Sequence, residues 1–316
     1  MPHHASHHDH GAHHGDRQAT GDSHPHDHGR GRRSGYTRLV VGQQIGQNLA
    51  YVNWVVLTGL AVGTFAAVLV GRFRTGATKG FLTFGSLCAA VFGFLAYLAD
   101  TALPASSAGS PITPDPAFDQ PRGLALAAFA GLGLAYTIAL ARGGRAPLLA
   151  SLTLAAGGGA ILLGSLGWGG GLPAAIPLLV QLAVLALATG GVFAAMILGH
   201  WYLVTPKLPE APLVLLARLL FTVVALQVVL FVVWISTGVG SGARPFEPLI
   251  GPWAFFVWLR LLIGLVFPLV VSWAALQTAR TRSMESATGL LYIDVGAIAA
   301  GTILAAGLYF GAGLLV

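Results

Sequence analysis

The chain has 316 residues, of which 55% are hydrophobic and only 9% are charged. A soluble domain carries about 25% charged residues, so this composition excludes an ordinary soluble protein and requires a lipid environment. The net charge of +6 does not indicate nucleic-acid binding, because the basic residues stand between long apolar runs and not on one polar face.

Residues 1–38 contain almost no large apolar side chains, so burial cannot offset the entropy cost of ordering them. We predict a disordered tail. Neutral imidazole binds Zn, Ni and Cu(II), and carboxylates can complete the ligand shell, so the tail is predicted to bind divalent metal ions. Its metal ligands are ten of the eleven histidines, namely His3, His4, His7, His8, His10, His13, His14, His24, His26 and His28. The run 22–29 resembles the histidine-rich segments of zinc, nickel and copper handling proteins.

Eight apolar stretches follow the tail, and each supplies the ~20 residues that cross a bilayer as a helix. They are predicted near 48–71, 80–103, 122–141, 146–167, 173–203, 211–238, 252–279 and 286–316. The sequence therefore predicts an all-α, polytopic transmembrane helical bundle over residues 39–316. Small residues such as Gly190 and Gly191 indicate closely packed helices, and Pro268 is expected to kink the seventh span.

Basic residues gather in alternate loops of this bundle. Loops 1–2, 3–4, 5–6 and 7–8 carry Arg72, Arg74, Lys79, Arg142, Arg145, Lys207, Arg280 and Arg282, whereas the other loops carry only Arg122 and Arg244. The positive-inside rule makes the first set cytoplasmic, so both termini are predicted on the extracytoplasmic side of a cell membrane. The arginines of the tail oppose this orientation.

Five ionisable residues lie within the predicted spans: Asp100, His200, Arg218, Arg260 and Asp294. Each costs roughly 2.5–3.5 kcal/mol at the bilayer centre, so each should be paired or face a polar cavity. Alternating span direction places them in two layers. We predict that Asp100 pairs with Arg260, and that Asp294 pairs with Arg218 with His200 nearby. These pairs either hold the helices of the bundle together or form a proton, ion or substrate site.

Among the uncharged polar residues of the spans, Gln227 is the best candidate for a cavity, because it lies mid-span on the helix of Arg218. Enzyme motifs are missing: there is no H-E-x-x-H, no phosphate-binding Gly-x-x-x-x-Gly-Lys and no Gly-x-Ser-x-Gly. An enzyme is therefore the less favoured class, and no catalytic residue is assigned.

Two classes of function remain, besides a structural or assembly protein. The first is a transporter or metal-handling permease whose tail binds Zn, Ni or Cu ions. The second is a cofactor-free, quinone-interacting membrane subunit of a respiratory or redox complex. Gly59-x-x-x-Gly63 and the run 99–104, which contains Asp100, make the first two spans similar to the polysulfide-reductase membrane-subunit family. That resemblance implies an acidic residue near a quinone pocket, although the Asp-Leu-Gly-Arg-Pro ending of the family is lacking.

Overall fold

The computed structural model describes residues 29–104, 111–205, 208–239 and 244–316, with side chains from Asn48 onward. Most of these residues are helical, and none of them forms a strand. The long helices are α1 (Gly29–Arg74), α2 (Lys79–Thr101), α3 (Asp119–Ala141), α4 (Pro147–Trp168), α5 (Leu172–Val204), α6 (Ala211–Thr237), α7 (Ala254–Leu261), α8 (Phe267–Arg280) and α9 (Met284–Ala312). The short elements are η1 (Pro116–Phe118), η2 (Glu247–Leu249) and the π-helical turn η3 (Leu262–Val266).

Eight helical segments of the described chain are long and apolar enough to cross a membrane, with α7, η3 and α8 forming one continuous span. The predicted all-α, multi-pass architecture is therefore confirmed. The chain divides into two units, Met1–Val41 and Gly42–Val316. The backbone is helical from Gly29, so residues 29–38 of the predicted tail belong to α1. The metal-binding histidines, His3 to His28, lie outside the described residues.

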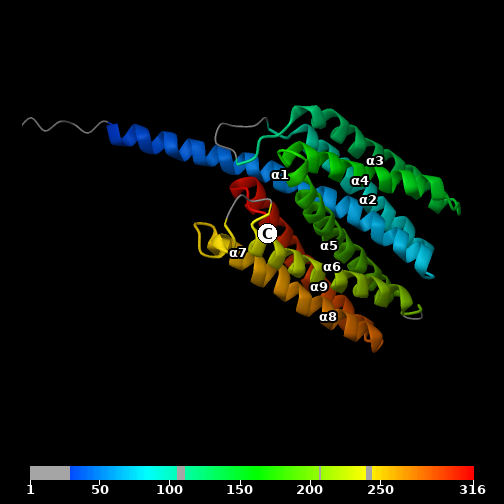
Figure 1. Cartoon of the computed structure of the whole chain (residues 1–316). Coiled ribbons are helices and arrows are strands. Elements are labelled where there is room, and N and C mark those ends of the chain that lie inside the picture. The colour runs from blue at the N-terminus through cyan, green and yellow to red at the C-terminus, as the bar shows by residue number, and fades with distance from the viewer. Residues whose placement is uncertain (1–28, 105–110, 206–207, 240–243) are drawn as a thin grey trace, which may run out of the picture. The chain divides into compact units, whose positions relative to one another are not determined.

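Within the second unit the helices pack in two groups (Figure 1). Helix α3 lies between α2 and α4, whereas α9 packs on α5 and α8, and α6 packs on α5 and α8. Helix α5 also contacts α4 and so connects the two groups.

Glycines bring α1 and α5 into backbone contact. A Cβ atom on Gly63 would collide with the carbonyl of Ala186, and one on Gly190 would collide with the backbone nitrogen of Thr64. Small residues permit this approach in membranes, where packing and not the hydrophobic effect holds helices together. Gly63, which carried part of the resemblance to the polysulfide-reductase family, is thus a packing residue in this chain. By contrast, a Cβ atom on Gly191 would meet nothing within 4 Å.

Hydrogen bonds join the first two basic loops at one end of the bundle. Arg72 donates from Nη1 to the Tyr136 hydroxyl (2.8 Å) and from Nη2 to the carbonyl of Arg145 (2.7 Å). Lys79 donates to the carbonyl of Ala141 (2.9 Å). The connections α1–α2 and α3–α4 therefore lie side by side, as alternating span direction requires.

Candidate functional site

A buried ion pair joins the end of α2 to the first turns of α3. Asp100 accepts a hydrogen bond from Nε of Arg122 at 2.6 Å and a second from the indole N–H of Trp54 at 2.7 Å. The pairing predicted for Asp100 with Arg260 is therefore wrong. Alternating span direction predicts Asp100 and Arg260 at similar depth in the membrane. Arg122, at the start of the very next span, lies closer to Asp100 and pairs with it.

The close approach of α2 and α3 positions this pair. A Cβ atom on Gly123 would lie 3.2 Å from Oδ2 of Asp100, so a larger side chain at that position would press on the carboxylate. Further along, a Cβ atom on Gly93 of α2 would lie 2.5 Å from the ring of Phe129 on α3. Glycines at these two levels let α2 and α3 approach closely and bring the two charges together.

Arg122 is almost fully buried, with 2% of its surface exposed. Its Nη2 atom lies 3.1 Å from Asp119, and its guanidinium carbon lies 4.7 Å from the ring centre of Trp168, a cation–π arrangement. Among the described residues its Nη1 atom has no hydrogen-bond partner. A buried guanidinium N–H without an acceptor is costly, and this atom is enclosed by the protein beside Gly167.

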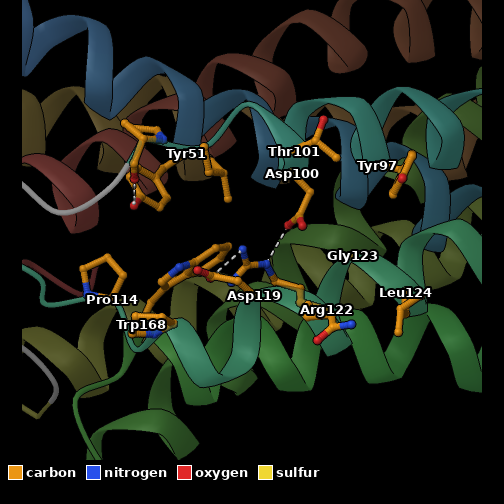
Figure 2. Close-up of a pocket in the computed structure, with 14 residues that line it drawn as sticks. Tyr51, Tyr97, Asp100, Thr101, Pro114, Asp119, Arg122, Gly123, Leu124 and Trp168 are labelled. Carbon is orange, nitrogen blue, oxygen red and sulfur yellow. Dashed lines mark hydrogen bonds and ion pairs between the residues drawn. The ribbon is translucent and has the colours of Figure 1, made fainter.

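These side chains line a cavity of about 600 Å³, which we call the Arg122 cavity (Figure 2). Polar groups come from Asp100, Asp119 and Arg122, and aromatic rings from Tyr51, Tyr97 and Trp168. Ligand sites in proteins usually combine such an aromatic lining with a few polar groups and have volumes of roughly 300–1,000 Å³.

The charged groups of the Arg122 cavity carry a net negative charge. One guanidinium is flanked by two carboxylates, Asp100 at 2.6 Å and the half-exposed Asp119 at 3.1 Å. An anionic head group would meet no net positive charge there, whereas a neutral group with hydrogen-bonding oxygens would meet both donors and acceptors. The arrangement therefore favours an uncharged polar ligand.

Arg260 forms a separate polar contact among α6, η3 and α9. It is 1% exposed, and it donates from Nη2 to the side-chain carbonyl of Gln227 (2.8 Å) and from Nη1 to the carbonyl of Gly264 (2.9 Å). Pro268 lacks the N–H that bonds the Gly264 carbonyl in a regular α-helix, and Arg260 donates to that carbonyl. Gln227, the predicted cavity residue, is thus a buried partner of Arg260.

The predicted group of Asp294, Arg218 and His200 does not form. Asp294 is fully buried, and in the described part of the chain neither carboxylate oxygen has a hydrogen-bond partner. Arg218 is exposed on α6, and the exposed His200 lies 3.4 Å from the hydroxyl of Tyr292. Span direction determines the depth of a residue but not the side of the helix it occupies, which explains the error.

No group of three or more His, Cys, Asp or Glu side chains that could hold a metal ion occurs in the described residues. The predicted metal ligands of the tail lie outside them, so tail binding stays a prediction.

Sequence reasoning missed Arg122, Trp54 and Trp168 as members of a site. Arg122 was counted as a loop charge, although it belongs to α3. One signal was present: Asp100 ends one span and Arg122 begins the next, so antiparallel neighbours must bring them to the same end of the bundle. The tryptophans carried no such signal, because nothing in the local sequence shows which partner an apolar face will meet.

The eight apolar helices make the chain an integral, multi-pass membrane protein. No protein-family model, no curated protein and no solved structure matches it.

Proposed function

We propose that the protein is a quinone-interacting membrane subunit of a respiratory or redox complex, and that the Arg122 cavity holds the quinone head group. The observation that supports this most is the buried Asp100–Arg122 pair, at 2.6 Å, in the wall of a cavity rich in aromatic side chains. A quinone head is flat and uncharged and carries carbonyl oxygens, so it fits a cavity that has hydrogen-bonding groups and no net positive charge.

Individual groups of the cavity match the needs of such a head group. The guanidinium of Arg122 lines the cavity and is the donor proposed for a quinone carbonyl. The rings of Trp168 and Tyr51, which meet edge to face with centroids 5.6 Å apart, offer apolar surfaces for a flat ring. The carboxylates of Asp100 and Asp119 can accept hydrogen bonds from the hydroxyls of the reduced form.

Tryptophan fluorescence provides a direct test, because Trp168 lines the cavity and Trp54 contacts Asp100. The full chain in lipid nanodiscs is titrated with decylubiquinone, and saturable quenching is expected. The double variant Asp100→Asn/Arg122→Gln removes both charges but keeps hydrogen-bonding groups of similar size. Its affinity should fall by about tenfold or more, as expected when hydrogen bonds to a charged group, worth ~1.5–3 kcal/mol, are lost.

Arg218→Gln is the matched control, because Arg218 is exposed on α6 and does not line the cavity. It should bind decylubiquinone as the unchanged protein does. Quenching that does not saturate, or equal affinities in the double variant and the unchanged protein, would overturn the proposal. Membership of a respiratory or redox complex is tested separately, by co-purification with an iron–sulfur or molybdenum subunit.

Transport and metal handling stay predictions from the tail and the intramembrane charges. Asp294, Arg218 and His200 do not form the group predicted for the bundle, so no site in the described helices favours transport over quinone binding. Flux of Zn, Ni or Cu ions into proteoliposomes that contain the protein would restore that alternative.

A further inference from the structure

A second, apolar groove of about 500 Å³ begins where the Arg122 cavity ends. Tyr97 lines both, and the lining continues from Leu124 in the cavity to Ala127 in the groove, one turn further along α3. Figure 2 shows Tyr97 and Leu124 on the side of the cavity away from Pro114 and Trp168. The groove therefore continues the cavity along the α2–α3 contact.

Helix periodicity accounts for the course of this groove. On α2 its lining runs from Tyr97 through Phe94 to Leu87, residues that share one face of the helix. Ten residues of helix span roughly 15 Å, so the groove extends well into the bilayer from the cavity. Small residues on the α3 side, Ala127, Ala130 and Gly131, leave the space that forms the groove.

The groove faces lipid and offers almost no polar group. Phe94 is 53% exposed and Leu134 is 47% exposed, and both lie in helices that span the membrane. The cavity by contrast carries Asp100, Asp119 and Arg122. A polar compartment that opens into an apolar one matches a molecule with a polar head and a long hydrocarbon tail.

We infer that the ligand of the Arg122 cavity is an amphiphile whose isoprenoid or alkyl tail lies in the groove between α2 and α3. This inference rests on the proposed function for the head group and adds the tail, its location and the route of entry. The ligand reaches the cavity sideways from the bilayer, past Tyr97. Its head is not a phosphate, because the cavity wall carries a net negative charge, and the proposed quinone head is uncharged.

Gly131→Leu tests the tail site without disturbing the fold, because a Cβ atom on Gly131 would meet nothing within 4 Å. The leucine side chain fills the groove about two turns of helix from the cavity. Gly158→Leu is the matched control, since Gly158 is also an exposed mid-helix glycine with nothing within 4 Å, on α4 and outside the groove.

Each variant is titrated in nanodiscs with decylubiquinone and with the same dimethoxymethylbenzoquinone lacking the decyl tail. Comparing variants for one ligand cancels the different partitioning of the two ligands into lipid. Gly131→Leu should weaken decylubiquinone binding by about tenfold, which corresponds to roughly two methylene groups that lose their contact with the groove. Binding of the tail-free quinone should stay the same in all three proteins.

Three results would overturn the inference. Equal decylubiquinone affinities in Gly131→Leu and Gly158→Leu would leave the head site standing and reject the tail site. An equal loss for both ligands in Gly131→Leu would show that the substitution acts on the head site. Absence of binding by either ligand to the unchanged protein would reject the proposed function, and the tail site with it.

Discussion

Asp100 and Asp294 are both buried carboxylates within spans, and their surroundings differ completely. Asp100 accepts hydrogen bonds from Arg122 and Trp54, whereas Asp294 has no partner among the residues that the structure describes. Removing one member of a buried ion pair leaves the other charge uncompensated, but removing an unpaired polar group relieves its desolvation cost. The two residues should therefore respond in opposite ways to the same substitution.

Asp294→Leu should stabilise the protein, because the unpaired carboxyl is replaced by an apolar side chain of similar size. We expect the free energy of unfolding to rise by about 1–3 kcal/mol, the cost of an unsatisfied buried polar group. Thermal unfolding in one detergent measures this change as a higher Tm. A lower Tm would mean that Asp294 has a partner in the membrane-embedded protein and would make it a functional candidate.

Asp100→Leu should destabilise the protein, because Arg122 is left buried without its carboxylate. The expected loss is about 3–5 kcal/mol, as for other broken buried pairs. A lower Tm in the same detergent measures this loss of stability. An unchanged Tm would show that Asp119, which lies 3.1 Å from Arg122, is a sufficient partner.

In the seventh span, a side chain donates a hydrogen bond to a backbone carbonyl beside an irregular helical turn. The π-helical turn of this span, Leu262–Val266, lies directly before Pro268, where the sequence predicts an irregular helix. The free carbonyl of Gly264 accepts from Arg260, one turn earlier on the same span. Glycine is needed at position 264, because a Cβ atom there would lie 2.6 Å from the Cα atom of Gly301 on α9.

A double-mutant cycle tests this role of Arg260. Arg260→Met alone should lower stability, because the Gly264 carbonyl and Gln227 lose their donor. In a Pro268→Ala background the new N–H at position 268 can bond Gly264, so the same substitution should cost about 1 kcal/mol less. Thermal unfolding of the four proteins measures the coupling. Additive effects would show that the proline and the arginine act independently.

At the scale of the whole molecule, the connections alternate between two ends of the bundle. The loops α1–α2 and α3–α4 are joined by Arg72 and Lys79, whereas Asp100 and Arg122 lie at the opposite ends of their helices. The basic loops therefore occupy one side of the membrane. The positive-inside rule predicts that this side is cytoplasmic.

Cysteine labelling tests this orientation in a Cys88→Ser background, which removes the single native thiol. Gly76→Cys and Thr281→Cys, in basic loops, should be shielded from an impermeant reagent added outside intact cells. Ile250→Cys, in the α6–α7 connection and 87% exposed, should react. Reaction at positions 76 and 281 with protection at position 250 would reverse the predicted orientation.

Metal binding by the N-terminal tail is predicted to be independent of the transmembrane bundle. Deleting residues 1–28 should abolish Zn and Ni binding measured by calorimetry, whereas His200→Ala, which changes the one histidine beyond the tail, should bind as the full chain does. Imidazole must be neutral to bind, so acidification to about pH 5 should release the ions. Retention of binding after the deletion would place the metal ligands elsewhere.

The sequence predicted the number of spans, their alternation and the irregular helix at Pro268. These properties depend on apolar length and on proline chemistry, which are local. It also placed Asp100 and Arg260 at similar depth, because depth follows from counting residues along a span. It did not determine which side of a helix faces which neighbour.

Tertiary structure alone decided the partners. Rotation of each helix about its axis is set by packing contacts between distant segments, such as Gly63 against Ala186 and Gly123 against Asp100. Those contacts pair Asp100 with Arg122, leave Asp294 without a partner among the described residues and turn Arg218 outward. They also join a polar cavity to an apolar groove at Tyr97, an arrangement that depends on how α2 and α3 meet and that is not visible in either helix alone.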